Sequence, residues 1–201
     1  MNNPTLTYYN ENVDAFLSST TTVDLSEIQD QFLSYLNPGD RILDLGCGSG
    51  RDTKYFLDEG FDVDAVDGSV ELVIRASSYT GIQVKRMLFD ELACINKYDG
   101  IWACASLLHL PYSQLSPMLD KIARALNEHG IFYASFKYGE FEGERNGRYF
   151  TDLNEERCRE LIGNNGKFHI ECLWTTGDTR LEKGEEKWLN MILIKDFQNQ
   201  R

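Results

Sequence analysis

The sequence predicts a single α/β domain with a mostly parallel β-sheet and helices on both faces. Short apolar segments alternate with amphipathic helical segments through most of the chain, which is typical of parallel strands joined by helices. A glycine-rich turn directly follows the first apolar segment. The last two apolar segments have no helix between them, so we expect a terminal antiparallel hairpin. One domain over residues 1–201 is expected, with an N-terminal helical arm over 1–37 and a core over 38–201.

The first well-marked helix is predicted over residues 24–36. Asp24 and Glu27 have the spacing of a capping box. Apolar residues then recur at helical intervals, at Leu25, Ile28, Phe32 and Leu36. The sequence Asn-Pro-Gly at 37–39 ends this helix.

Five apolar segments predict the parallel part of the sheet. They cover residues 41–45, 61–66, 83–89, 98–106 and 131–136. Helices are predicted between them at 52–59, at 69–79 and around 117–126. Ser69 is a suitable N-cap, and Gly81 follows the end of the same helix. The fourth strand is apolar along most of its length, as expected of a strand covered on both faces.

The last third of the chain begins with a predicted polar loop over residues 137–150. Thr151 then caps a predicted helix with apolar residues between Leu153 and Ile162. The two terminal strands are predicted at 167–175 and 187–195. A turn-rich segment with Gly177, Asp178 and Gly184 separates them.

Charge and hydropathy argue against two classes of protein. The chain has 32 acidic and 20 basic residues, a net charge of −12, whereas nucleic-acid binding requires Lys and Arg to neutralise phosphates. Nucleic acid is therefore an unexpected partner, although the overall charge does not exclude a local basic groove. No apolar run approaches the ~20 residues of a membrane span, and the polar start lacks the features of a signal peptide. We expect a cytoplasmic protein without membrane contact.

The five cysteines predict neither a metal site nor a disulfide. None forms a Cys-x-x-Cys pair or a cluster with histidine at zinc spacing. Scattered through apolar segments, they fit reduced thiols in the core. They are Cys47, Cys94, Cys104, Cys158 and Cys172.

The strongest functional signal is the segment Arg41–Arg51, RILDLGCGSGR. Its three glycines follow a buried strand and precede a helix, so a ligand can approach the backbone and the unpaired N–H groups of the helix. Dinucleotide-binding turns read Gly-x-Gly-x-x-Gly, and Arg51 stands where the last glycine would be. A carboxylate at Asp44 would repel a pyrophosphate and suits a cationic group. The turn therefore favours a positively charged, nucleotide-like ligand over NAD.

Asp67 is the second signal, at the end of the second predicted strand. An acid ~20 residues beyond such a glycine turn is placed to accept hydrogen bonds from ribose hydroxyls. NAD enzymes use the same arrangement, so Asp67 supports an adenosine ligand without choosing between cofactors. The alternative is an acid that only caps the next helix.

Together these segments resemble the successive motifs of class I S-adenosylmethionine-dependent methyltransferases. The resemblance rests on Ile42–Gly50, Asp67, Tyr98–Cys104 and Leu107–Leu110, and it extends over nearly the whole chain. Among these enzymes the chain is most similar to small bacterial ones grouped with the tellurite-resistance methyltransferases. The resemblance implies a Rossmann-like, seven-stranded sheet and S-adenosyl-L-methionine as cofactor. It also implies methyl transfer by in-line displacement.

The same resemblance implies roles for the cofactor-binding residues. The methionine part would be held by Asp44, Gly46, Cys47, Gly48 and Gly50. The ribose would be bound at Asp67 and Gly68, and the adenine would be bordered by Leu88, Phe89 and Asp90. The methyl group would lie near Ala103 and Cys104, although Cys104 fits a plain core residue equally well.

His109 is the candidate catalytic base. It follows the fourth predicted strand, where parallel sheets open their binding crevice, and its ordinary pKa of ~6.5 suits proton transfer. The alternative is a histidine that packs or orients its loop. An acceptor that needs no deprotonation requires only alignment.

Three segments are candidates for the substrate pocket. Their candidate residues are Tyr8, Tyr9, Lys137, Tyr138, Arg145, Arg148 and Trp174. Two arginines are suited to bind a carboxylate or phosphate. Alternatively they are solvated charges that pair with Glu140, Glu142 and Glu144.

A small-molecule acceptor is the function that the sequence favours. The alternatives are a nucleic-acid or protein methyltransferase and a non-catalytic nucleotide-binding module. Amino-directed DNA enzymes have an Asn-Pro-Pro-Tyr type of motif after the fourth strand, where this chain has Ala105–His109. The acids form no recognisable metal-ligand set.

Overall fold

The computed structural model describes residues 4–178 and 186–196. Its main sheet comprises β1 (Arg41–Leu45), β2 (Asp62–Asp67), β3 (Lys85–Arg86), β4 (Tyr98–Ala103), β5 (Leu126–Lys137), β8 (Phe168–Gly177) and β9 (Lys187–Lys195). The helices are α1 (Pro4–Glu11), α2 (Val13–Thr20), α3 (Ser26–Leu33), α4 (Arg51–Asp58), α5 (Val70–Thr80), α6 (Tyr112–Ala125) and α7 (Glu155–Asn165). A small second sheet pairs β6 (Glu142–Arg145) with β7 (Arg148–Thr151).

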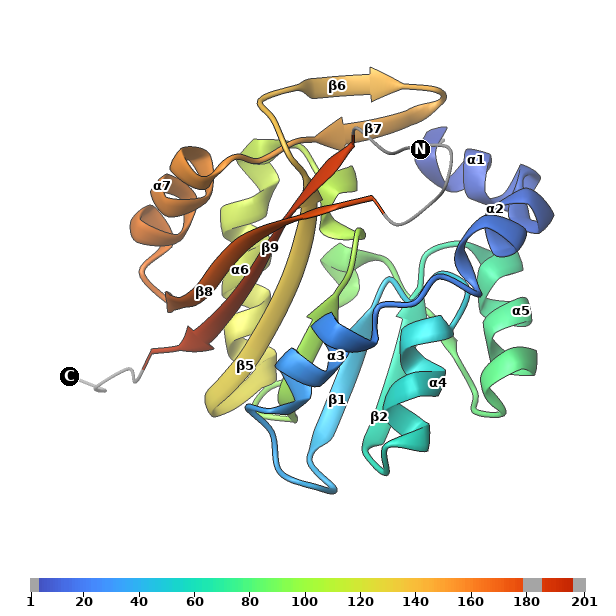
Figure 1. The fold of residues 1–201 in the computed structure, drawn as a ribbon, viewed down its shortest axis with the longest axis horizontal. Helices are drawn as coiled ribbons and strands as arrows, with labels where there is room; N and C mark the ends of the chain where they lie inside the picture. Colours follow the sequence, from blue (N-terminus) through green and yellow to red (C-terminus); the bar gives the residue numbers. More distant parts are fainter. Residues whose placement is uncertain (1–3, 179–185, 197–201) are drawn as a thin grey trace.

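The seven strands of the main sheet lie in the order β3-β2-β1-β4-β5-β9-β8. Strands β1 to β5 are parallel, and β9 is antiparallel to both β5 and β8. This confirms the predicted Rossmann-like fold with an antiparallel C-terminal strand pair (Figure 1). Parallel strands end at one edge of the sheet, so the loops after β1, β2, β4 and β5 meet there.

Apolar side chains bury both faces of the sheet. Helices α3 and α4 cover one face, and α6 and α7 cover the other (Figure 1). On the α3–α4 side, Trp102 and Tyr133 stack with ring centroids 3.9 Å apart, and Phe32 of α3 packs edge-on against Trp102. All three side chains are fully buried. This packing fixes the ends of β4 and β5, where the loops of the site begin.

The prediction of a loop over residues 137–150 is wrong, because most of this segment forms the β6–β7 hairpin. Its turn is Asn146-Gly147, with φ of 50° and 75°. Asn-Gly at two positive-φ positions is the preferred two-residue hairpin turn. The hairpin lies across the carboxyl edge of the main sheet, beside α1 (Figure 1).

Several predicted boundaries also change. Thr151 is not a helix cap: it ends β7, and its hydroxyl donates to the Leu110 carbonyl oxygen at 2.7 Å. Asn154 caps α7 instead, accepting from the Arg157 N–H at 2.9 Å. Strand β3 is only Lys85–Arg86, and α6 begins at Tyr112 rather than near 117. Of the predicted turn, Gly184 lies outside the described residues.

The N-terminal segment forms α1, α2 and α3. Two contacts hold α1 over the carboxyl edge of the sheet. Thr5 Oγ1 accepts from the backbone N–H of Tyr149 in β7 at 3.0 Å, and Ser69 Oγ lies 2.6 Å from Asn10 Oδ1. Helix α1 therefore joins the start of α5 to the hairpin. No helix in the described part of the chain is long and apolar enough to cross a membrane.

Candidate active site

The glycine turn after β1 forms a tight loop that is hydrogen-bonded to the end of β2. The N–H groups of Gly46 and Cys47 both donate to the Val66 carbonyl oxygen at 2.9 Å. Gly46 has a φ of 85°, and a Cβ there would lie 2.5 Å from Ser106 Cβ. Only glycine fits this position, since both the backbone angle and the space exclude a side chain.

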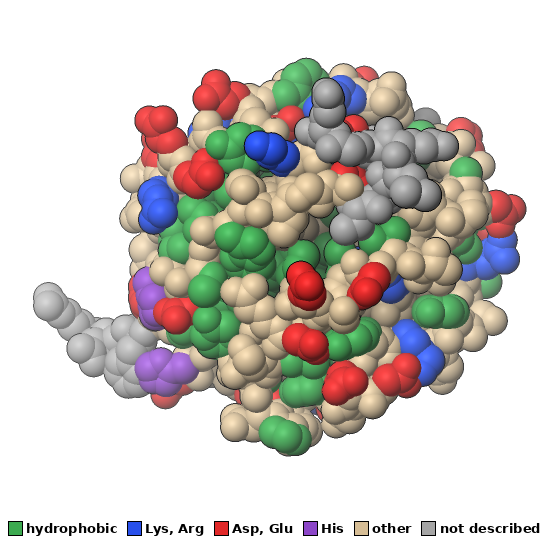
Figure 2. Space-filling model, in the orientation of Figure 1, with side chains coloured by type: hydrophobic (Ala, Val, Ile, Leu, Met, Phe, Trp, Pro, Cys, Tyr) green, Lys and Arg blue, Asp and Glu red, His purple; other side chains and the backbone are tan. Residues whose placement is uncertain are grey.

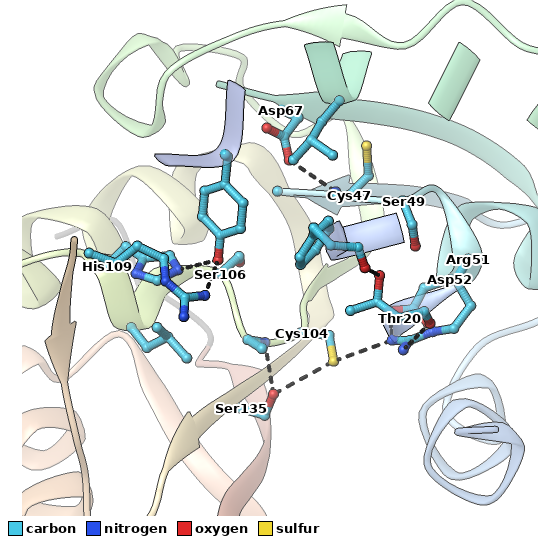
Figure 3. A pocket seen from close by; sticks show the side chains of 18 of the residues that line it. Thr20, Cys47, Ser49, Arg51, Asp52, Asp67, Cys104, Ser106, His109 and Ser135 are labelled. Atoms are coloured by element: carbon cyan, nitrogen blue, oxygen red, sulfur yellow. Dashed lines mark hydrogen bonds and ion pairs between the residues drawn. The ribbon is translucent and has the colours of Figure 1, made fainter. Parts of the chain in front are cut away.

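Asp67 connects this loop to the loop after β2. Its carboxylate accepts from the Gly48 N–H at 2.9 Å and from the Ser69 N–H at 2.8 Å. Burial raises the pKa of Asp67, and these backbone hydrogen bonds partly oppose that rise. The side chain is half-buried and lines the cavity (Figure 3). Its remaining acceptor capacity is available to a ligand.

A cavity of about 2280 Å³ opens beside these loops. Its walls come from the glycine loop, the α1–α2 segment, the loop after β4 and the β6–β7 hairpin. Pockets for one small ligand commonly measure about 300–1,000 Å³, so this cavity has room for a cofactor and an acceptor together. Of the residues predicted from the sequence, it is lined by Tyr8, Tyr9, Gly46, Cys47, Gly48, Asp67, Gly68, Leu88, Phe89, Asp90, Cys104, His109, Lys137, Arg145 and Arg148.

Five predicted site residues do not line the cavity. Asp44 is buried behind the glycine loop, where it accepts from the Thr53 hydroxyl at 2.5 Å; burial and the neighbouring Asp52 raise its pKa. Gly50 faces Thr80 and Ala76 of α5. Ala103 is fully buried, and Trp174 packs 6.3 Å from the ring of Tyr133. Tyr138 is exposed and donates to Glu155.

The sequence interpretation missed an ion pair in the cavity wall. Arg51 binds Asp52 through two hydrogen bonds, of 2.7 and 2.9 Å. Asp52 also accepts from Gln29 at 2.7 Å and from Trp102 Nε1 at 2.9 Å. The only signal in the sequence was Arg51 in place of a glycine. Its partners come from α3 and β4, and only the fold brings these together.

The loop after β4 and strand β5 bring three more polar groups to the cavity. Ser106 donates to the Leu45 carbonyl oxygen at 2.7 Å, and the Ser135 hydroxyl accepts from the Ala105 N–H at 2.9 Å. Cys104 lies between Arg51 and Ser135, with its sulfur 3.9 and 3.7 Å from their polar atoms (Figure 3). Burial raises the pKa of Cys104 to about 12, so it is a neutral thiol.

His109 lies across the cavity from Arg51 and Asp52 (Figure 3). Its Nδ1 is 2.7 Å from the Tyr149 carbonyl oxygen, and its Nε2 is 2.9 Å from the Tyr9 hydroxyl. A carbonyl only accepts, so Nδ1 carries the proton and Nε2 accepts from Tyr9. Burial lowers the pKa of His109 to about 4, so the ring is neutral at pH 7. The acceptor nitrogen of the candidate base is therefore occupied by the Tyr9 hydroxyl.

Among the described residues, neither Arg145 nor Arg148 forms an ion pair with the expected Glu140, Glu142 or Glu144. Arg145 pairs with Asp152, and Lys137 pairs with Glu186. Glu142 pairs with Arg157 at 3.5 Å instead. Three cavity residues that the sequence did not single out are Tyr133, Trp188 and Asn190, from β5 and β9.

The fold and this cavity define an α/β protein with a large cavity at the carboxyl edge of a Rossmann-like sheet, where such sheets commonly bind ligands. Residues 42–130 match the methyltransferase domain model. An uncharacterized methyltransferase of Synechocystis sp. is 27% identical over 103 residues, covering 48% of this chain and 47% of that protein. The chain thus matches about half the length of this relative.

Solved structures with the same fold include several methyltransferases. A 1,6-didemethyltoxoflavin-N1-methyltransferase of Burkholderia thailandensis, crystallised with S-adenosylhomocysteine, has a TM-score of 0.76 at 22% identity, over 96% of this chain and 85% of that one. A magnesium protoporphyrin IX methyltransferase of Synechocystis has a TM-score of 0.71 at 19% identity, over 94% of this chain and 97% of that one. A methyltransferase of Methanosarcina mazei has a TM-score of 0.75 at 17% identity, over 88% of this chain and 100% of that one. At these identities the solved structures show a shared fold, and the match of residues 42–130 shows likeness to a methyltransferase domain in sequence.

Proposed function

We propose that this protein is an S-adenosylmethionine-dependent methyltransferase that acts on a small-molecule acceptor by in-line displacement. The observation that carries the proposal is the link between Gly48 and Asp67 at the edge of a cavity large enough for two ligands. The methyltransferase domain match over residues 42–130 supports it. Two structural neighbours crystallised with S-adenosylhomocysteine support the choice of cofactor.

The residues at the glycine loop fit an adenosyl cofactor. Asp67, next to Gly68, is free to accept from ribose hydroxyls, and the glycine-loop backbone at Gly46, Cys47 and Gly48 borders the methionine part. Leu88, Phe89 and Asp90 line the side of the cavity assigned to the adenine. Asp44, Gly50 and Ala103 support these groups from behind the cavity wall.

S-adenosylmethionine supplies a methyl group activated by its positive sulfonium. The chain contributes binding, alignment and exclusion of water. Cys104 stays a neutral thiol and so does not compete with the acceptor as a nucleophile. Where an acceptor must lose a proton, the Tyr9 hydroxyl can take it while passing its own proton to His109 Nε2.

A small-molecule acceptor fits the enclosed position of the site better than a nucleic acid does. In the face shown in Figure 2, acidic side chains gather over α3 and α4, and such a surface repels phosphates. The toxoflavin and protoporphyrin enzymes named above act on small molecules by their descriptions. The grouping with tellurite-resistance enzymes, the cytoplasmic location and the single-domain organisation remain predictions.

The test is a calorimetric titration with S-adenosylmethionine, S-adenosylhomocysteine and NAD. Both adenosyl ligands are expected to bind and NAD is not. Asp67→Asn is expected to weaken adenosyl binding by about 1–3 kcal/mol, because a charged acceptor for the ribose hydroxyls is lost. Asp64→Asn is the matched control: Asp64 is on the same strand, outside the cavity lining, and binds Lys97 and Tyr98.

Two results would count against the proposal. Absence of adenosyl binding would remove the cofactor assignment. Binding without transfer of a labelled methyl group, over a screen of small acceptors, would favour the alternative of a non-catalytic module.

A further inference from the structure

Four half-buried cations line the cavity, and one of them lacks a carboxylate partner among the described residues. The pairs are Arg51–Asp52, Lys137–Glu186 and Arg145–Asp152. Arg148, at the start of β7, is the fourth cation and forms no such pair within residues 4–178 and 186–196. Cations that are removed from water are normally paired, so Arg148 is an exception that calls for a ligand.

Aromatic rings surround the Arg148 guanidinium. Its central carbon lies 4.3 Å from the ring centroid of Tyr8, 5.7 Å from that of Tyr9 and 5.1 Å from that of Phe150. Nη1 is 3.4 Å from the Tyr9 hydroxyl, and the buried Nε has no acceptor. The rings hold the side chain in place but accept few of its hydrogen bonds. An incoming acceptor group would therefore gain the donors that the protein leaves unused.

The local charge favours a monoanion. Lys137, Arg145 and Arg148 all lie around the ring of Phe150, at 5.8, 4.8 and 5.1 Å from its centroid. Two carboxylates, from Glu186 and Asp152, offset two of these charges. One positive charge remains, in a chain whose net charge is −12. A carboxylate would neutralise it, whereas a phosphate dianion would leave an excess of negative charge.

We propose that the methyl acceptor carries a carboxylate and that Arg148 binds this group as the specificity-determining residue. The inference rests on the proposed function, because it places the acceptor beside the cofactor part of the same cavity. Arg148 is suited to this role because its planar fork matches a carboxylate. The Tyr9 hydroxyl, which is within reach of both Arg148 and His109, lies next to the bound anion.

The test uses pairs of probes that differ only in charge. Benzoate and benzamide, and 4-hydroxybenzoate and 4-hydroxybenzamide, are titrated by ligand-observed NMR and calorimetry, with and without saturating S-adenosylhomocysteine. Each carboxylate is expected to bind the wild type at least tenfold more tightly than its amide. Arg148→Gln is expected to abolish this preference, and Arg148→Lys to restore part of it. Arg124→Gln makes the same charge change on the exposed side of α6 and is expected to leave the preference intact.

Several outcomes would overturn the inference. These are equal binding of carboxylate and amide, no carboxylate binding up to 10 mM, or a preference that survives in folded Arg148→Gln. Tighter binding of phenyl phosphate than of benzoate would contradict the choice of a carboxylate. Because the probes are also titrated without S-adenosylhomocysteine, a failure of cofactor binding is seen separately from a failure at Arg148.

Discussion

At the scale of single residues, His109 shows how burial decides protonation. The ring donates from Nδ1 to the Tyr149 carbonyl oxygen and accepts at Nε2 from the Tyr9 hydroxyl. Burial disfavours the charged imidazolium, and the nearby Arg148 charge disfavours it further, so the ring is neutral. A histidine predicted as the candidate base is therefore held as one neutral tautomer, with its Nε2 occupied by the Tyr9 hydroxyl.

This arrangement predicts that stability falls in acid. The pKa of His109 is about 4 in the folded protein against an ordinary 6.5, so between these values the unfolded chain binds a proton that the folded chain does not. The contribution of His109 to the free energy of unfolding is expected to drop by up to about 3 kcal/mol as pH falls from 6.5 to 4. The difference between wild type and His109→Gln isolates it from buried Asp44, whose raised pKa acts in the opposite direction. Urea unfolding across this range measures it. His109→Gln is expected to flatten the dependence, and His169→Gln, at an exposed histidine, is expected not to.

The proposed proton path can be tested at the same pair. With an acceptor that must be deprotonated, Tyr9→Phe and His109→Gln are each expected to lower kcat by about 10²–10⁴ while KM changes little. A purely structural role would instead leave kcat intact in the fraction that stays folded. Full activity in folded Tyr9→Phe would exclude the path.

At the scale of elements, substitutions of two glycines outside the glycine loop are expected to change stability in opposite directions. Gly163 lies within α7 with open space where a Cβ would be, so Gly163→Ala is expected to stabilise the protein by about 0.5–1 kcal/mol. At Gly100 of β4, a Cβ would lie 2.8 Å from Phe32 and 2.9 Å from Leu36. Gly100→Ala is expected to destabilise by about 1–3 kcal/mol through overpacking.

Thermal or urea unfolding of both glycine variants provides the measurement. The result depends on α3 lying tightly against β4, as the edge-on contact between the rings of Phe32 and Trp102 indicates. Equal effects of the two substitutions would contradict this packing.

Most elements were predictable because their signals are local. Ser69 caps α5 by accepting from Leu72, and Gly81 ends the same helix with a φ of 78°. The β6–β7 hairpin was missed although Asn146-Gly147 is a strong turn signal, because its short polar strands lack the apolar alternation of a buried sheet. Thr151 was misassigned as a cap because capping residues also suit strands, and only packing against Leu110 decides between the two.

At the scale of the molecule, the N-terminal helices and the β6–β7 hairpin together enclose the cavity. Tyr149 of β7 donates to Thr5 of α1, and Asn10 of α1 contacts Ser69 at the start of α5. These few polar contacts join segments that are far apart in the sequence (Figure 1). Such segments open more easily than the core.

Cofactor binding is therefore expected to protect them together. Saturating S-adenosylhomocysteine should slow amide hydrogen exchange in α1, α2 and the β6–β7 hairpin, with little change in α7. Hydrogen-exchange mass spectrometry with and without the ligand measures this. Protection confined to the loops after β1 and β2 would show that the cavity wall does not respond to the cofactor.

By itself the sequence determined the alternation of parallel strands and helices, the position of the glycine loop and the place of Asp67 at the end of a strand. These depend on apolar periodicity and on backbone angles encoded by neighbouring residues. The tertiary structure alone decided that Asp44 lies behind the loop, that the Tyr9 hydroxyl contacts His109 Nε2, and that Arg148, unlike Arg145, lacks a carboxylate partner among the described residues. Such pairings join residues that are distant in the chain. They are set by burial and by the geometry of the partners, and neither is visible in the local sequence.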